Sequence, residues 1–145
     1  MSNIFGLSSY RRLNTIHPVL KVLCIAILDR MDVSIVCGYR GEEDQNEAYN
    51  SNNSGVKFPN SKHNQSPSSA VDITPYINGK GIRWDSREVS FMQGRIQEIA
   101  DYLSIPIRWG GDWDGDGDIT EHKLKDFVHI EIDTEEINNT VWRYL

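Results

Sequence analysis

Residues 15–31 carry apolar side chains at the spacing of a single helix face, and this segment constrains the fold more than any other. The face consists of Ile16, Val19, Leu20, Leu23, Ile27 and Leu28. Thr15 is placed to cap the helix, and Pro18 fits its first turn. We therefore expect a core helix, which must bury this face against a second layer of structure.

Short stretches rich in β-branched residues indicate what the second layer is. We expect extended structure over residues 33–39, 70–74, 105–109 and 128–132, the last with strict alternation of apolar and polar side chains. Helical patterns occupy residues 42–49, 86–103 and 135–145, while residues 50–69 and 110–125 have loop composition. This order predicts an α+β fold, in which helices pack on a small antiparallel sheet.

Length and composition limit the class of protein. The chain has 145 residues, and we expect residues 1–145 to form a single domain. It contains no apolar run long enough to span a membrane, and its N-terminus lacks the pattern of a signal peptide. We therefore expect a soluble protein made in the cytoplasm, without membrane insertion. Cys24 lies in a helical pattern and Cys37 in a strand-like run, which favours buried thiols over a disulfide.

Charge is distributed unevenly along the chain. Residues 112–136 contain ten acids and two lysines, a charge of −8, whereas the remainder contains eleven acids and thirteen bases, a charge of +2. The sum is the formal net charge of −6. Because phosphate binding needs a basic stripe and this chain has none, nucleic acid is excluded as a partner. Clustered carboxylates repel one another unless solvent or a cation screens them.

Two strand residues and one loop residue form a candidate metal site. His129 in the segment VHIEI and Asp72 in the segment AVDIT each lie on the polar side of a strand. Neighbouring strands would bring them within ligand distance, and His63 in a loop can supply a third ligand. Three such ligands leave a tetrahedral zinc ion one open position, as in catalytic sites. Asp126 is placed to take a proton from water and pass it to the leaving amine.

Each of these residues also has a structural alternative, since a strand histidine is commonly only hydrogen-bonded and the aspartate could pair with a lysine. The motifs around them are Ser61-Lys62-His63, Ala70-Val71-Asp72, Trp109-Gly110-Gly111-Asp112-Trp113 and Asp126-Phe127-Val128-His129-Ile130-Glu131. Together they resemble the zinc-dependent peptidoglycan peptidases of the D-alanyl-D-alanine carboxypeptidase family. The nearest branch is that of phage endolysins acting as L-alanyl-D-glutamate endopeptidases, and the similarity runs over residues 17–132.

The resemblance implies a fold and a set of roles. The fold would be that of the zinc D-Ala-D-Ala carboxypeptidases and hedgehog-like domains. His63, Asp72 and His129 would hold zinc, and Asp126 would be the general base and acid. Arg40 matches the family's arginine near the scissile carbonyl, where a guanidinium can stabilise the developing oxyanion.

The loop before Asp72 departs from the family pattern. The commoner form is SxHxxGxAxD, whereas HNQSPSSAVD lacks the glycine and separates His63 from Asp72 by two further residues. Because closure entropy grows slowly with loop length, the two ligands can still converge if the extra residues bulge outward. We expect Ser61 to shape this loop by hydrogen bonding to the backbone. Glu131 shares a strand side with His129, and it either orients that ligand or is simply solvated.

The acidic segment contains a second candidate metal site. Four aspartates alternate with other residues there: Asp112, Asp114, Asp116 and Asp118. The pattern is close to the first eight positions of a calcium loop. The twelfth position is Lys123 in place of a bidentate Glu, so a ligand is missing unless Glu121 or water replaces it. Bound calcium would order the segment that leads to His129 and act as an activity switch; the alternative is a solvated acidic turn.

These inferences lead to one expected function and three alternatives. We expect a zinc metallopeptidase that hydrolyses a stem-peptide amide of bacterial peptidoglycan, between L-alanine and D-glutamate, and serves host lysis by a bacteriophage. We expect a monomer that stays in the host cytoplasm until lysis and then reaches the periplasm or cell wall. The alternatives are a D-alanyl-D-alanine carboxypeptidase, a non-catalytic metal-binding module for wall attachment, and a phage structural protein with a wall-penetrating peptidase domain.

Overall fold

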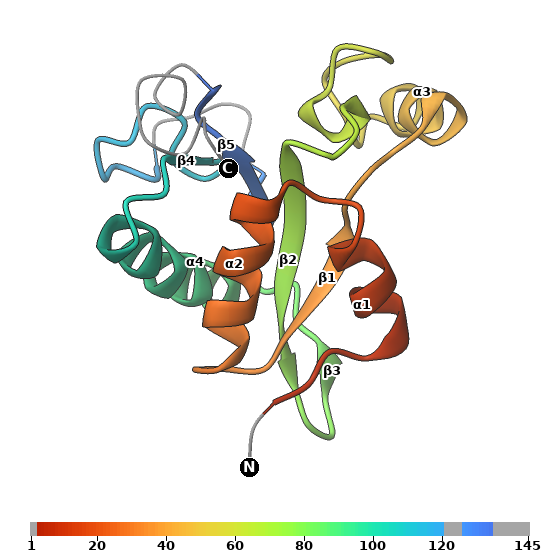
Figure 1. Ribbon diagram of the computed structural model, residues 1–145. Coiled ribbons are helices and arrows are strands. Elements are labelled where there is room, and N and C mark those ends of the chain that lie inside the picture. Colours follow the sequence, from red (N-terminus) through yellow and green to blue (C-terminus); the bar gives the residue numbers. More distant parts are fainter. Residues whose placement is uncertain (1–2, 121–125, 135–145) are drawn as a thin grey trace.

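A computed structural model describes residues 3–120 and 126–134, and it has the α+β architecture expected from the sequence. In chain order the elements are α1 (Leu7–Leu13), α2 (Pro18–Leu28), β1 (Val33–Cys37), α3 (Glu42–Asn50), the 3-10 turn η1 (Lys62–Asn64), β2 (Ala70–Ile77), β3 (Gly81–Ile82), α4 (Ser86–Tyr102), β4 (Ile107–Trp109) and β5 (His129–Ile132) (Figure 1). The strands pair antiparallel in the order β1-β2-β5-β4, and β3 pairs with β2.

An apolar core joins the sheet to α2 and α4. The two helices contact each other, and in Figure 1 α2 lies between α4 and the strands β2 and β1. The apolar face predicted for the first of them is buried, together with Val89, Met92, Ile96 and Ile99 of α4. The strands contribute Ile35, Val71, Ile73, Ile130 and Ile132 to the same core. Since burying each such side chain contributes about 1.5–3 kcal/mol, this core determines which strand residues face the other way.

The beginning of α2 differs from the sequence prediction. The helix begins at Pro18, and its cap is His17, whose Nδ1 accepts a hydrogen bond from a first-turn amide at 3.1 Å. The prediction that Thr15 is the cap was wrong. The Thr15 hydroxyl instead accepts a hydrogen bond from the Tyr39 amide at 2.9 Å, a partner distant in sequence that spacing cannot reveal.

The remaining elements follow the sequence prediction in type more closely than in extent. Helices α3 and α4 lie where the patterns placed them, and β2 continues three residues beyond its predicted end. The short elements α1 and β3 were not predicted, and the helix predicted over residues 135–145 lies outside the described residues. Both cysteines are free thiols, with Cys24 buried and Cys37 partly exposed. Among the described residues, no helix has the length and apolar content that crossing a membrane requires.

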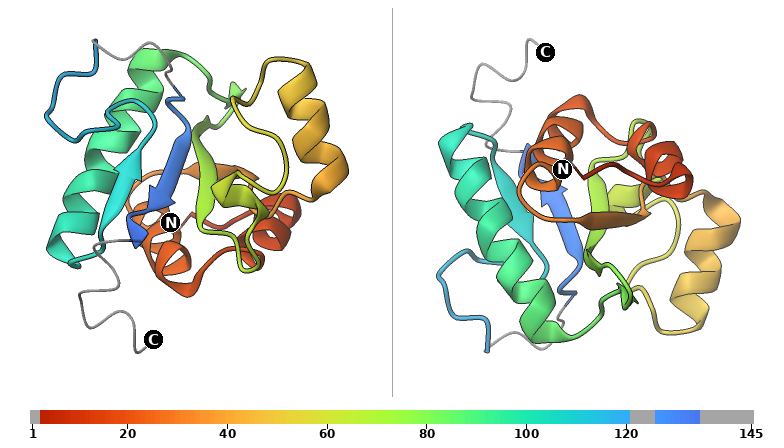
Figure 2. Two further views of the ribbon diagram at one scale, coloured as in Figure 1. Left: turned by 90° about the horizontal axis from the view of Figure 1, so that it is seen from above. Right: turned by 90° about the horizontal axis from the view of Figure 1, so that it is seen from below.

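The register of the sheet places polar side chains of neighbouring strands next to one another. Asp72 pairs with His129 across β2 and β5, and the same aspartate pairs with Cys37 across β1 and β2. Figure 2 shows α3 and α4 on opposite sides of the strands, so different segments border the two sides of the sheet. The turn η1 contacts β2 and brings His63 to it.

Candidate metal centre

Two histidine nitrogens and one carboxylate oxygen meet where β2 and β5 run side by side. The Nε2 atom of His63 lies 3.2 Å from Asp72 Oδ1 and 3.2 Å from His129 Nδ1. The third side of this triangle, from His129 Nδ1 to Asp72 Oδ1, measures 3.3 Å. All three side chains are buried. The structure thus brings together the three residues that the sequence predicted as ligands, and we call them the ligand triangle.

Hydrogen bonds on the outer side of each ring assign the protons. His63 Nδ1 lies 2.8 Å from the Gly38 carbonyl oxygen, and His129 Nε2 lies 3.1 Å from Glu131 Oε1. Carbonyl and carboxylate oxygens only accept, so these two nitrogens donate and their ring partners keep free lone pairs. Those two ring nitrogens and the Asp72 oxygen point toward one another, an arrangement that bound protons or a metal ion can stabilise. Glu131 is buried and hydrogen-bonded to His129. Of the two roles considered for Glu131, the structure therefore supports orienting the His129 ring and not simple solvation.

The charges of the ligand triangle favour a positive ion among its members. Burial alone would lower the pKa of His63, but hydrogen bonds with Asp72 and Cys37 and the charges of these two groups together outweigh it, and the pKa rises to about 10. In the same way the pKa of His129 rises to about 9. Burial would raise the pKa of Asp72, yet hydrogen bonds from His129 and His63 hold it well below its usual range. Protons and a metal ion therefore compete for the same place.

A capped turn presents His63 to the strands. The Ser61 hydroxyl accepts a hydrogen bond from the His63 amide at 3.2 Å, and the Asn64 side chain accepts one from the Ser61 amide at 3.0 Å. Together they form a capping box around η1. The predicted role of Ser61 in shaping the loop is confirmed, and His63 reaches Asp72 although the loop is two residues longer than the family pattern.

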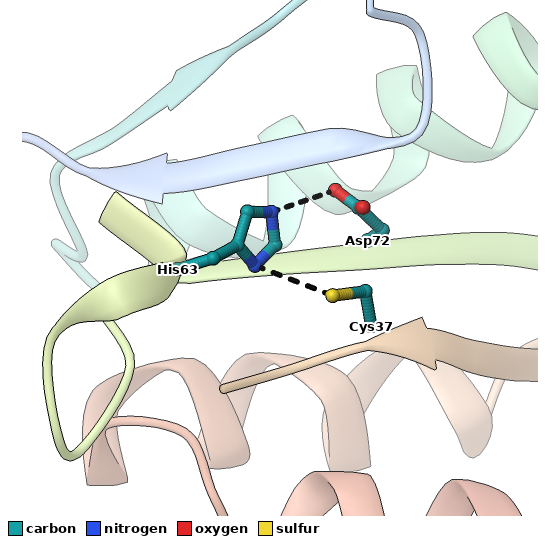
Figure 3. A group of neighbouring side chains, drawn as sticks. All are labelled: Cys37, His63 and Asp72. Atoms are coloured by element: carbon teal, nitrogen blue, oxygen red, sulfur yellow. Dashed lines mark hydrogen bonds and ion pairs between the residues drawn. The ribbon is translucent and has the colours of Figure 1, made fainter. Parts of the chain in front are cut away.

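Arg40 and Cys37 lie on the opposite side of Asp72 from His129. Arg40 Nη2 is 3.7 Å from Asp72 Oδ2 and donates a hydrogen bond to Cys37 Sγ at 3.4 Å. Figure 3 shows the His63 ring between Asp72 and Cys37, with one ring nitrogen toward each; the Nδ1 to Sγ distance is 3.7 Å. The sequence pattern indicated only that Cys37 lies in a strand. Its position three residues before Arg40, a predicted site residue, was the signal that could have placed Cys37 at the site.

Two overlapping groups of side chains here have the spacing to hold a metal ion. Cys37, His63 and Asp72 form one, and Asp72, Asp126 and His129 form the other, each with ligand atoms within 4.8 Å of one another. Both groups include Asp72, the buried carboxylate between the two histidines. This part of the sheet is therefore a candidate metal centre.

Asp126 borders this centre with a partly exposed carboxylate. Its Oδ2 lies 4.0 Å from His129 Nδ1, and its side chain is 43% exposed. Burial of the carboxyl, and then the nearby charge of Asp72, raise the pKa of Asp126. A carboxylate with a raised pKa that reaches solvent beside a metal centre is suited to accept and return a proton.

The Trp109-Gly110-Gly111 segment at the end of β4 holds the backbone of Asp126 in place. The Asp126 amide donates to the Gly110 carbonyl at 2.9 Å, and the Gly110 amide donates to the His129 carbonyl at 2.9 Å. A Cβ atom on Gly110 would lie 2.2 Å from the Asp126 carbonyl oxygen, so only glycine permits this approach. The Trp109 indole donates to the Phe127 carbonyl at 2.7 Å. This segment therefore sets the position of the carboxylate next to the centre.

The predicted calcium loop is an exposed turn with its own hydrogen bonds. Carboxylate oxygens of Asp112, Asp114 and Asp116 can lie within 4.8 Å of one another, as a cation would require. The Asp112 carboxylate also accepts a hydrogen bond from the Gly117 amide at 2.9 Å. The Asp114 carboxylate accepts one from the Asp116 amide at 3.3 Å. Such bonds occur in solvated acidic turns as well, so calcium here stays a prediction. The twelfth position and its predicted substitute lie outside the described residues.

Known proteins share the sequence and the fold of this chain. A family model described as phage L-alanyl-D-glutamate peptidase matches residues 1–133. The L-alanyl-D-glutamate peptidase of Escherichia phage T5 is 32% identical over 138 residues, covering 91% of this chain and 99% of that protein. The crystal structure of Serratia marcescens L-Ala D-Glu endopeptidase ChiX has the same fold, with a TM-score of 0.73, 22% identity and coverage of 92% and 93%. This chain belongs to the family of phage L-alanyl-D-glutamate peptidases.

Proposed function

We propose that this chain is a zinc peptidase that hydrolyses the amide between L-alanine and D-glutamate in the peptidoglycan stem. The observation that carries the proposal is the ligand triangle of His63, Asp72 and His129, with Asp126 beside it. Family membership supports the choice of bond, and the L-alanyl-D-glutamate peptidase of phage T5 supports a role in degrading the wall of a phage host.

The spacing within the ligand triangle supports zinc. Zinc binds histidine nitrogen and carboxylate oxygen at about 2.0–2.1 Å, and a regular tetrahedron of that size has edges of about 3.3–3.4 Å. The three edges measured here are 3.2, 3.2 and 3.3 Å. Cys37 fits less well as a ligand, because His63 Nδ1 already donates to a carbonyl and Arg40 Nη2 contacts both Cys37 and Asp72.

The proposed reaction divides the work among three groups. His63, Asp72 and His129 would hold the zinc ion, which would supply Lewis acidity for the scissile carbonyl and for water. Asp126 accepts a proton from the attacking water at its exposed carboxylate and delivers it to the nitrogen of the departing D-glutamate. Arg40 donates hydrogen bonds to the oxyanion that develops on the L-alanine carbonyl.

The setting of this activity extends the same proposal. We infer a monomeric single-domain enzyme that stays in the host cytoplasm until lysis and then acts on peptidoglycan, without nucleic acid as a partner.

The alternative bond, between two D-alanine residues, would release free D-alanine, whereas the proposed bond exposes a new D-glutamate amine. Mass spectrometry of digested peptidoglycan distinguishes the two outcomes.

The decisive experiment replaces Asp126 with alanine. Because a general base contributes about 10²–10⁴-fold, we expect Asp126→Ala to lower kcat by about 1000-fold while the zinc content, measured by metal analysis, stays the same. Asp101→Ala is the matched control, since Asp101 is an exposed aspartate of α4. Unchanged turnover in Asp126→Ala would contradict the proposed role, and a wild-type enzyme that exposes no D-glutamate amine would contradict the proposed bond.

A further inference from the structure

Helix α3 buries a glutamine where an amphipathic helix would bury apolar side chains. Within Glu42–Asn50 the buried residue is Gln45, with 0% of its surface exposed. The rest of the helix is mostly polar and contributes nothing to the apolar core of the described residues. A buried amide needs hydrogen bonds to offset its desolvation. Gln45 is therefore the buried contact of α3, and Asn46 adds a hydrogen bond from the Phe58 amide at the partly buried edge.

Gln45 has partners for both ends of its amide. Its Nε2 donates to the Val56 carbonyl at 2.8 Å and to the Ser54 hydroxyl at 2.9 Å. Its Oε1 accepts from Arg40 Nη1 and from Asn64 Nδ2, each at 3.2 Å. A carbonyl can only accept and a guanidinium can only donate, so these neighbours leave one orientation for the amide.

The same network holds Arg40 from three directions. The Arg40 amide donates to the His63 carbonyl at 2.8 Å, and the Arg40 carbonyl accepts from Asn64 Nδ2 at 2.9 Å. These bonds fix the Arg40 backbone to the turn that carries His63. The contact between Gln45 and Nη1 then restrains the guanidinium itself. One amide thus links α3, the turn η1 and the charged end of Arg40.

The distance between Arg40 and Asp72 shows why such a restraint matters. Arg40 Nη2 lies 3.7 Å from Asp72 Oδ2, whereas a charge-assisted hydrogen bond between such groups is about 2.7–2.9 Å long. Electrostatic attraction draws the guanidinium toward this carboxylate. If Arg40 closed that gap at Oδ2, its own charge would be neutralised, and a second positive charge on the Asp72 carboxylate would weaken the attraction of Oδ1 for a metal ion.

We propose that Gln45 is a positioning residue that holds the Arg40 guanidinium apart from Asp72, and this inference rests on the proposed function. By keeping the two groups apart, Gln45 leaves the Asp72 carboxylate available to the metal ion. It also leaves an N–H face of Arg40 available to the oxyanion. Gln45 acts through Arg40 alone and does not touch the substrate.

A double-mutant cycle on zinc affinity tests the inference without relying on activity. We expect Gln45→Met, which keeps the side-chain length but loses the amide, to weaken zinc binding by about tenfold. Adding Arg40→Ala should restore the affinity to within about twofold of Arg40→Ala alone, because no guanidinium remains to neutralise Asp72. Equal weakening with and without Arg40, or no weakening, would overturn the inference.

Turnover and a second variant separate positioning from a general loss of structure. We expect Gln45→Met to lower kcat by about tenfold in wild type and by less than about twofold in Arg40→Ala. Gln45→Glu keeps an acceptor for Arg40 but sets a carboxylate against the Val56 carbonyl. It should therefore lose thermal stability yet bind zinc more tightly than Gln45→Met; the reverse order would overturn the inference.

A control variant measures the effect of lost stability alone. Asp85 caps α4 by accepting hydrogen bonds from the Arg87 and Glu88 amides, and it belongs to neither the ligand triangle nor the Gln45 network. Asp85→Ala should lower the melting temperature with zinc affinity unchanged. A wild-type protein that binds zinc but cleaves no stem amide would refute the proposed function, while the zinc cycle would still decide the role of Gln45.

Discussion

Two regions of this molecule collect carboxylates and other metal-binding groups, and they differ in how they are built. The ligand triangle draws one residue each from η1, β2 and β5, and all three are buried. The acidic loop takes Asp112, Asp114 and Asp116 from one stretch of five residues that is largely exposed. The triangle is held by the sheet, whereas the loop is held by hydrogen bonds to its own amides.

This difference shows when a cluster of potential ligands indicates a bound metal ion. In the triangle, outer hydrogen bonds to the Gly38 carbonyl and the Glu131 carboxylate turn the opposite ring nitrogens toward the Asp72 oxygen, as the rings of metal-binding histidines are held. In the acidic loop, the largely exposed carboxylates accept hydrogen bonds from backbone amides, and such bonds also occur in turns that hold no ion. Burial and fixed direction distinguish the two regions more than charge does. The four predictions that follow test this contrast.

The largest expected effect is the loss of a ligand from the triangle. His63→Ala should lower zinc affinity and turnover by more than about 100-fold, which exceeds the cost of losing an outer partner. Equilibrium dialysis with metal analysis and a peptidoglycan digestion assay measure the two quantities. His17→Ala is the matched control, because His17 only caps α2. If His63→Ala kept its zinc, the triangle would not be the metal centre.

A smaller effect is expected when the outer partner of a ligand changes. Glu131 orients His129 through a hydrogen bond of 3.1 Å. Glu131→Gln keeps the shape but weakens the acceptor, so zinc affinity should fall by about tenfold. Competition with a chelator of known affinity measures the change. An affinity equal to that of wild type would mean that the sheet alone orients the ring.

Zinc affinity should also depend on pH in a defined direction. In the metal-free protein the pKa of His63 is raised to about 10 and that of His129 to about 9, so both rings hold protons at neutral pH. Zinc must displace these protons, and its affinity should rise by about tenfold per pH unit for each proton released. Calorimetric titration in buffers of different ionisation enthalpy counts them. An affinity that does not change between about pH 6 and 8 would contradict this coupling.

The smallest expected effect concerns the acidic loop. If calcium binds there, it should raise the melting temperature of the chelated and zinc-restored protein by about 4 °C. Replacing Asp114 and Asp116 together with Asn should abolish that rise and leave zinc affinity unchanged. Unchanged melting temperature and activity on adding calcium to the wild-type protein would mean that the loop is a solvated turn.

Much of the fold followed from sequence patterns, and the exceptions share a cause. The apolar periodicity of α2 and α4 and the alternation around β5 depend on burial against one core, which a pattern records directly. The short elements α1 and β3 carry too few residues for a period to show. The cap of α2 was misassigned because the hydroxyl of Thr15 has a tertiary partner in Tyr39.

The candidate site was predictable in its members and not in its supports. Strand alternation and motif spacing indicated His63, Asp72 and His129 before any contact was known. Gln45 and Cys37 were missed, because a polar helix and a strand thiol look ordinary until their neighbours are known. Gln45 lies five residues after Arg40 on α3, and Cys37 lies three residues before it on β1. Their contacts with Arg40 therefore join separate elements.

By itself, the amino-acid sequence determined which side chains carry chemistry and on which side of a strand or helix they lie, because the periods of these elements are set by backbone geometry. Only the tertiary structure decided which atoms meet. Strand register brought Asp72 beside His129, a carbonyl chose the proton position of His63, and a buried amide restrained Arg40. These contacts depend on distances between segments, and local periodicity carries no information about such distances.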